Sequence, residues 1–227
     1  MPLHSLQPLP GGAWLGRWHL LETPAALWPL LADAPAYAPL LPARAAGPRQ
    51  AQWLAGRVLM QHLLAVAGYP PAPLRNDAAT GRPYLLGASA LGPTVSLSHA
   101  GAWVAALLAP PGVAAGLDVE AVRPKAARVA AKFLNTPELA ASELALGQGA
   151  APEYLYSLLW SAKETLFKLS GRAGIIFREN LLLDLPPAPW PPAGVLAARL
   201  QLTGRQTRHQ ICYFEPAAGY VLTYCVG

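Results

Sequence analysis

Residues 160–168 read Trp-Ser-Ala-Lys-Glu-Thr-Leu-Phe-Lys and lie inside a run over residues 154–169 that contains neither Gly nor Pro. Gly171 follows shortly after this run, and a glycine just past a periodic segment is typical of a helix end. We therefore expect one helix here. At 3.6 residues per turn, its polar face carries Trp160, Glu164 and Lys168, while the leucines around them can point into a core.

A second group of carboxylates lies upstream, where residues 116–120 read Gly-Leu-Asp-Val-Glu. Side chains alternate along a strand, so Asp118 and Glu120 share one face and the apolar residues between them face the other way. Three carboxylates from a strand and a helix suit a hard divalent cation, and the nearby lysines suit phosphate oxygens. Glu164 and Lys168 could also form a simple surface pair, but their apolar neighbourhood weakens that interpretation.

The composition is that of a globular protein. The chain has 227 residues, of which 53% are hydrophobic and 13% charged, so it can build one large domain or two small ones. Its net charge of +5 permits an anionic partner such as a nucleic acid, a phosphorylated cofactor or an acidic protein. The basic residues are scattered rather than clustered, which disfavours a dedicated nucleic-acid binder.

Three features bear on location. The first residues, Met-Pro-Leu-His-Ser-Leu, lack the basic start and apolar core of a secretory signal, so we expect a cytoplasmic protein. Residues 100–117 are uncharged, but Pro110-Pro111-Gly112 interrupts them, which favours strand–loop–strand over a membrane span. Cys212 and Cys225 could meet across a hairpin, but free buried thiols are favoured over a disulfide.

The rest of the chain mixes helical and strand-like segments. Residues 49–66 have a broad apolar stripe before Gly68, which predicts a second long helix. Asn135 before Thr136-Pro137-Glu138 predicts a helix start, where Glu138 complements the helix dipole. Strands are expected over residues 94–99, 103–108, 175–177, 180–185, 195–202, 209–215 and 220–226.

An internal repetition relates the two parts of the chain. The helices over residues 49–66 and 154–169 are each followed by a pair of strands. We therefore expect an α+β fold of two similar α/β halves, residues 1–112 and 113–227, each with a mainly antiparallel sheet and a long helix. A pseudo-twofold arrangement of the halves would place the active site in the cleft between them.

The two motifs, residues 116–120 and 160–168, together resemble the paired signature of the 4′-phosphopantetheinyl transferases. Gly81-Arg82-Pro83 and Ser98-His99 stand upstream in the expected order. Leu54-Ala55-Gly56-Arg57 resembles the longer, surfactin-type enzymes. The chain length agrees with that monomeric, two-half class rather than with the short trimeric carrier-protein synthases.

The resemblance covers about residues 49–226 and implies a reaction. Enzymes of the family move the 4′-phosphopantetheine arm of coenzyme A onto a serine of an apo acyl or peptidyl carrier protein and release adenosine 3′,5′-bisphosphate. The implied ligands of Mg²⁺, or alternatively Mn²⁺, are Asp118, Glu120 and Glu164. Glu164 is then the candidate to remove the serine proton, and Lys168 or Lys163 would contact the transferring phosphate.

The resemblance also implies which residues hold coenzyme A. The candidates for its phosphates are His99, Ser98, Arg82, Arg49 and Arg57. The sequence by itself favours ordinary solvated arginines for Arg49 and Arg57. Ala100 stands where a second serine is common in the family, and Arg82 stands where a lysine is often found. Adjacent residues in a strand point to opposite faces, so Ser98 and His99 do not form a hydrolase pair.

The expected protein partner is an acidic carrier. Carrier proteins present an acidic helix beside the modified serine, and a net-basic chain suits it. The local basic cluster, which fits an ordinary solvated face equally well, is Arg123, Lys125, Arg128 and Lys132. Carriers of fatty acid, polyketide, nonribosomal peptide, lysine or siderophore synthesis remain alternatives. Two other functions also stay open: another metal-dependent phosphoryl or phosphodiester enzyme, and a coenzyme A-binding module without turnover.

Overall fold

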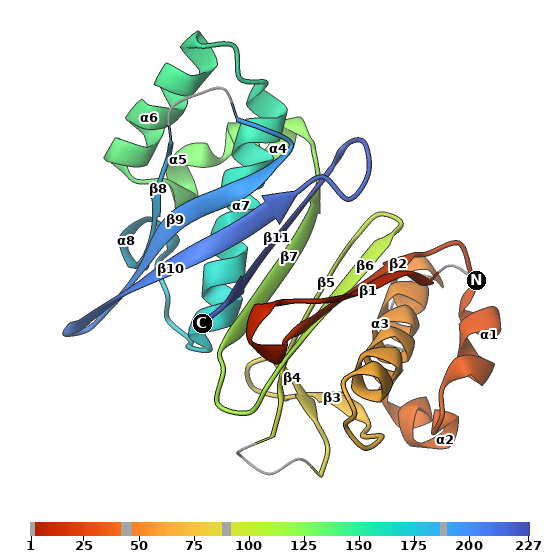
Figure 1. Cartoon of the computed structure of the whole chain (residues 1–227). Coiled ribbons are helices and arrows are strands. Elements are labelled where there is room, and N and C mark those ends of the chain that lie inside the picture. The colour runs from red at the N-terminus through yellow and green to blue at the C-terminus, as the bar shows by residue number, and fades with distance from the viewer. Residues whose placement is uncertain (1–2, 42–46, 88–91, 187–189) are drawn as a thin grey trace. The chain divides into compact units, whose positions relative to one another are not determined.

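The chain forms two compact units, Met1–Ala115 and Gly116–Gly227. Figure 1 shows the computed structural model, which describes residues 3–41, 47–87, 92–186 and 190–227. Each unit has its own hydrophobic core and combines an antiparallel sheet with one long helix. This confirms the predicted α+β class, while the pseudo-twofold relation stays a prediction.

The first unit is built on a four-stranded sheet in the order β1-β2-β6-β5, in which every neighbouring pair is antiparallel. Its strands are β1 (Leu3–Pro8), β2 (Trp14–His19), β5 (Thr94–Ala100) and β6 (Trp103–Ala109). Helix α3 (Gly47–Val66) packs on this sheet. The smaller elements are α1 (Pro24–Leu27), α2 (Ala34–Tyr37), the 3-10 turns η1 (Pro10–Gly12), η2 (Trp28–Leu30) and η3 (Ala38–Leu40), and the hairpin of β3 (Leu74–Asn76) and β4 (Pro83–Leu85).

Glycines let α3 lie close against the sheet. A Cβ atom on Gly56 would come within 2.8 Å of the Leu97 side chain, and one on Gly16 would come within 2.8 Å of Leu59. Strand β6 is buried at every position, which explains why its sequence is a continuous apolar run rather than an alternation.

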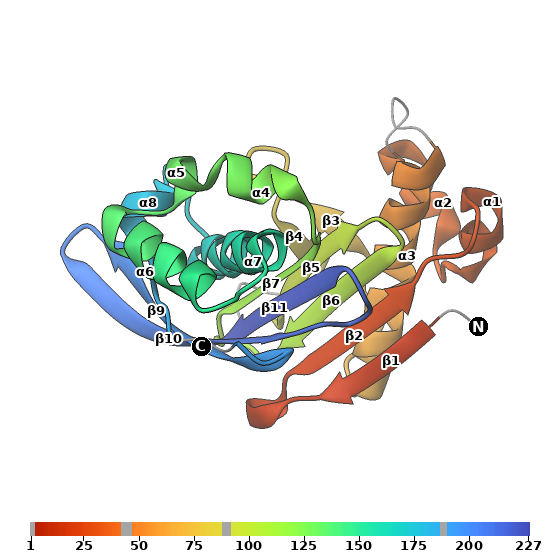
Figure 2. The same ribbon diagram turned by 90° about the horizontal axis from the view of Figure 1, so that it is seen from above.

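The second unit contains a five-stranded sheet in the order β7-β11-β10-β9-β8. Its strands are β7 (Ala115–Ala121), β8 (Leu181–Asp184), β9 (Ala193–Leu202), β10 (Arg205–Phe214) and β11 (Tyr220–Val226). Its helices are α4 (Pro124–Arg128), α5 (Ala130–Phe133), α6 (Thr136–Gly147), α7 (Pro152–Ser170) and α8 (Phe177–Asn180). Helix α7 packs against β11 of this sheet and against α4, and Figure 2 shows α7 beside α4.

Helix α7 carries the stretch 160–168, and the structure confirms both its existence and its end. Gly171 follows it in the left-handed conformation, with φ 63°. Three hydroxyl groups anchor the helix to β11: the Oγ1 atom of Thr223 lies 2.9 Å from Ser161 Oγ and 2.7 Å from Thr165 Oγ1. All three side chains are fully buried. Because a buried hydroxyl without a partner is costly, these directional bonds favour one placement of α7 on the sheet.

Some details differ from the sequence prediction. The strand expected over residues 175–177 is wrong, because Phe177 begins the short helix α8. The sequence does not predict β1 and β2; β2 pairs with β6, which is distant along the chain, and β1 pairs with β2 at the edge of the sheet. The other expected strands are confirmed within a few residues.

The cysteines are free thiols, as expected. Cys212 lies opposite Tyr224 in the register of β10 and β11, so the next residue, Cys225, points to the other face of the sheet. Within the described part of the chain, no helix is long and apolar enough to cross a membrane.

Candidate active site

Strand β7 and helix α7 touch almost backbone to backbone. A Cβ atom on Gly116 would overlap the carbonyl oxygen of Thr165 and come within 2.9 Å of the Leu169 nitrogen. Glycine is therefore required for this approach. Asp118 and Glu120 follow Gly116 by two and four residues on β7. The close contact therefore places both carboxylates beside the part of α7 that carries Glu164 and Lys168.

Lys168 binds the first of these carboxylates. Its ammonium nitrogen lies 2.8 Å from Asp118 Oδ1 and 2.9 Å from the carbonyl oxygen of Leu117. Asp118 is almost fully buried, whereas about a quarter of the Lys168 side chain, 26%, is exposed. An ammonium group has three N–H donors, so these two bonds leave a third for another acceptor.

Trp160 holds the second carboxylate. Its indole nitrogen donates to Glu120 Oε1 at 3.0 Å. Burial and, next, the charge of Asp118 raise the pKa of Glu120 to about 7, although the bond from Trp160 and the charge of Lys168 oppose this shift. Glu120 therefore stands in an environment that disfavours its negative charge.

Glu164 lies in the same electrostatic environment. Burial and, next, the charge of Asp118 raise the pKa of Glu164, while Lys168 lowers it. Within the described ranges, no group of three His, Cys, Asp or Glu side chains stands close enough, as placed, to hold a metal ion. The donor chemistry nevertheless fits Mg²⁺, which takes carboxylate oxygens, and the mutual repulsion of these carboxylates is what a divalent cation would offset.

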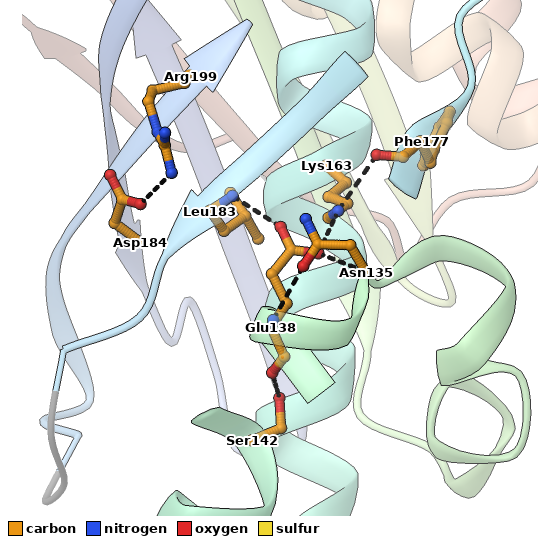
Figure 3. Close-up of polar contacts among 8 residues, drawn as sticks. All are labelled: Asn135, Glu138, Ser142, Lys163, Phe177, Leu183, Asp184 and Arg199. Atoms are coloured by element: carbon orange, nitrogen blue, oxygen red, sulfur yellow. Dashed lines mark hydrogen bonds and ion pairs between the residues drawn. The ribbon is translucent and has the colours of Figure 1, made fainter. Parts of the chain in front are cut away.

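Lys163 is placed differently from Lys168. Its side chain has no exposed surface, and its ammonium nitrogen lies 2.6 Å from Glu138 Oε2 and 3.2 Å from the carbonyl oxygen of Phe177 (Figure 3). The sequence suggests Lys163 as a phosphate contact, but this burial leaves a phosphate no access to it. We therefore retain Lys168 alone for that role.

The coenzyme A candidates of the first unit fall into two groups. Arg49 at the start of α3, Arg82 in the turn between β3 and β4, and His99 on β5 are exposed, and Ser98 is half-buried. Arg57 is buried, with an exposed fraction of 5%. The buried placement argues against phosphate contact by Arg57.

Arg57 instead supports the turn that carries Arg82. Its guanidinium lies 3.5 Å from the ring centre of Trp53 and donates to Asn76 Oδ1 at 2.6 Å. Asn76 in turn donates to the carbonyl oxygen of Gly81 at 2.9 Å. Desolvation lowers the pKa of Arg57 to about 9. Sequence reasoning missed this role, because nothing in the helix pattern distinguishes a buried arginine from a solvated one.

Two further features of the second unit are not visible as motifs. The bond from Trp160 to Glu120 joins two stretches that the sequence singles out separately. The hydroxyl cluster of Ser161, Thr165 and Thr223 fixes α7 on the sheet. The only signal for this cluster is the presence of two hydroxyl side chains within an otherwise apolar helical stripe.

Comparison with known protein families matches residues 114–225 to the model of the 4′-phosphopantetheinyl transferase superfamily. The matched range contains β7, α7 and all four side chains of the candidate site. A comparison with curated proteins finds no match. The family match therefore covers residues 114–225, which correspond to the second unit, and identifies them as similar to a 4′-phosphopantetheinyl transferase superfamily domain.

Proposed function

We propose that the protein transfers 4′-phosphopantetheine from coenzyme A to a serine of an apo acyl or peptidyl carrier protein, with Mg²⁺, and releases adenosine 3′,5′-bisphosphate. One observation carries the proposal. Within the range that matches this superfamily, Asp118, Glu120, Glu164 and Lys168 gather where β7 meets α7. They supply the anionic ligands and the positive charge that phosphoryl transfer needs.

The three carboxylates are the proposed metal ligands. Asp118 and Glu120 come from one strand face, and Glu164 comes from the facing helix. Mg²⁺ bound there would supply positive charge to the pyrophosphate oxygens of coenzyme A. The raised pKa values of Glu120 and Glu164 support this assignment, because burial and, next, the charge of Asp118 disfavour their ionised forms, which a bound cation would favour.

Lys168 and Glu164 have distinct roles in the proposal. The third N–H of the Lys168 ammonium would donate to an oxygen of the transferring phosphate. Glu164 would take the proton of the carrier serine as its oxygen attacks the β-phosphorus and the bond to the leaving adenosine bisphosphate breaks. The positive charges of Mg²⁺ and of Lys168 would keep Glu164 ionised, so that its carboxylate can accept this proton.

The first unit would contribute the contacts to coenzyme A. In this proposal, Arg49, Arg82, Ser98 and His99 bind the phosphates of coenzyme A. The two arginines are suited to this role because a guanidinium group can donate two hydrogen bonds to phosphate oxygens. The surfactin-type, monomeric class and the use of residues 1–112 for these contacts are part of the same proposal. The carrier would dock through opposite charge, for which Arg123, Lys125, Arg128 and Lys132 are exposed candidates.

The test is an incubation of the purified protein with coenzyme A, Mg²⁺ and a panel of apo carriers, followed by mass spectrometry. We expect one carrier serine to gain a single phosphopantetheine, with release of adenosine 3′,5′-bisphosphate, and a chelator to stop the reaction. Cleavage of coenzyme A without a modified carrier would instead identify a phosphodiester enzyme. Tight binding of coenzyme A with no product would identify a module without turnover.

A further inference from the structure

The ion pair of Glu138 and Lys163 is buried on both sides. The exposed fraction of the side chain is 3% for Glu138 and 0% for Lys163, and the two charged groups are 2.6 Å apart. In contrast, the neighbouring pair of Asp184 and Arg199 has the same kind of contact at 2.7 Å but is exposed (Figure 3). The two pairs therefore provide a matched comparison within one unit.

Glu138 uses both carboxylate oxygens. Its Oε1 atom accepts from the backbone nitrogen of Leu183 at 2.8 Å, and its Oε2 atom accepts from that of Asn135 at 2.9 Å as well as from Lys163. The Asn135 side chain returns a bond to the Glu138 nitrogen, which completes a capping box at the start of α6. One carboxylate thus joins α6, β8 and α7.

Such a pair is a poor source of stability. Removing two charges from water is unfavourable, and apolar side chains of similar volume often stabilise a fold equally well. Five of the ten buried residues of α7 are leucines, but their packing is not directional and specifies a helix rotation less sharply than hydrogen bonds do. A buried ion pair with a full set of partners is better suited to fixing one arrangement of its neighbours.

A series of contacts connects the ion pair to the candidate site. Lys163 donates to the carbonyl oxygen of Phe177, and the Phe177 ring stacks on Trp160 with centroids 5.6 Å apart and an angle of 26°. Phe133 contacts the same indole edge-on at 5.1 Å. The indole held between these rings donates to Glu120. A continuous chain of contacts therefore runs from the buried pair to a proposed metal ligand.

We propose that Glu138 and Lys163 are positioning residues: through Phe177 they hold Trp160 against Glu120, and so hold that carboxylate ready for the metal. Neither residue touches a substrate. The expected loss of transfer activity in variants of this pair rests on the function proposed above. The expected change in the surroundings of the Trp160 indole does not. These two consequences can be measured separately.

Two single variants break the ion pair of Glu138 and Lys163, one at each partner. Lys163→Met removes the ammonium at similar length and leaves Glu138 bonded to two backbone N–H groups, while Glu138→Gln keeps its shape and removes its charge. Leu200→Ala, in the core on β9, is the control for lost stability, and Arg199→Met is the control for a broken ion pair. If each single variant breaks the same link, the double variant should be no worse than the poorer single variant.

The first measurement is the indole N–H resonance of Trp160, assigned by its absence in Trp160→Phe. In the metal-free protein we expect both single variants to shift this resonance and to lose its protection against exchange with solvent. We expect Leu200→Ala and Arg199→Met to retain the position and protection of the wild-type signal. Denaturant unfolding shows which variants remain folded. One folded single variant, either Lys163→Met or Glu138→Gln, is sufficient to test the positioning role.

The second measurement is the transfer rate. Substitutions of residues that orient metal ligands typically lower activity by about 10–100-fold, and we expect a loss in that range in kcat for both single variants. An unchanged indole signal in a folded variant would overturn the inference, and so would equal losses in Leu200→Ala. If the wild type transfers nothing while the indole signal moves as expected, the proposed function fails but the positioning role stands.

Discussion

The carbonyl oxygen of Thr165 lies where the first side-chain atom of residue 116 would stand if that residue were not glycine. The strand that carries Asp118 and the helix that carries Lys168 can meet only because Gly116 has no side chain. This close contact determines how far the carboxylates on β7 lie from Glu164 and Lys168 on α7.

Gly116→Ala should therefore damage both stability and activity. The added methyl group forces α7 away from β7, and we expect a loss of about 1–3 kcal/mol in the free energy of unfolding, because overpacking in a tight core costs this much. Urea denaturation measures it. Gly147→Ala is the control, since its Cβ atom would meet nothing within 4 Å. Equal stability of the two variants would show that the helix can move without cost.

Asp118→Ala should abolish Mg²⁺-dependent transfer while the fold stays intact. The substitution removes a proposed ligand and the partner of Lys168. We expect the transfer rate to fall by about 100-fold or more, which is a larger loss than substitution of a residue that only orients a metal ligand typically causes. Mass spectrometry of the carrier and circular dichroism measure the two effects. Asp184→Ala, which removes an exposed carboxylate, should leave both unchanged; full activity of Asp118→Ala would remove the metal assignment.

Lys168→Ala should lower the transfer rate far more than the thermal stability. Its ion pair with Asp118 is exposed only on the lysine side, so we expect a loss of about 1–3 kcal/mol in the free energy of unfolding, because a buried carboxylate loses its partner. Loss of a donor to a charged transition state typically lowers the rate by about 100–1,000-fold. Arg172→Ala controls for the loss of one exposed positive charge. A variant that is unstable but catalytically normal would make Lys168 a structural residue.

The metal-free protein should lose stability as the pH rises from about 5 to 8. The pKa of Glu120 is raised from 4.5 to about 7 in the folded state, so between these values the folded chain binds more protons than the unfolded one. Stability present at low pH is then lost on ionisation, by about 2 kcal/mol after allowance for partial exposure.

Urea denaturation at pH 5 and pH 8, with a chelator present, measures this change. Glu120→Gln keeps the shape of the side chain without its charge, so its stability should depend less on pH than that of the wild type. The charged groups around Glu120 are Asp118, Glu164 and Lys168. Added Mg²⁺ should raise the stability of the wild type most at pH 8. Parallel pH profiles of the wild type and Glu120→Gln would contradict the assigned origin of the effect.

The local patterns of the sequence predict much of the candidate site. A run without Gly or Pro before Gly171 predicts α7, and the alternation around Asp118 predicts a strand with both carboxylates on one side. These features depend on periods of two and 3.6 residues, which are local properties. The pairing of Lys168 with Asp118 follows once the two elements lie side by side.

Other features depend on tertiary packing, and the sequence does not predict them. Lys163 and Lys168 have the same side chain on the same helix, but only contacts with α6 and α8 make the first one buried. Arg57 is likewise covered by Trp53 and Asn76. The segment 175–177 is apolar enough for a strand, yet Phe177 packs on Trp160 at the start of a helix.

The order of strands in the second unit has a consequence for how the protein is made. Strand β7, which bears Asp118 and Glu120, has β11 as its neighbour, and β11 separates it from β10. A ribosome therefore delivers the carboxylates early, but the strand that fixes them emerges only after the whole unit has been synthesised. Until then β7 lacks its neighbour in the sheet, so we expect the candidate site to reach its final geometry only after β11 has been synthesised.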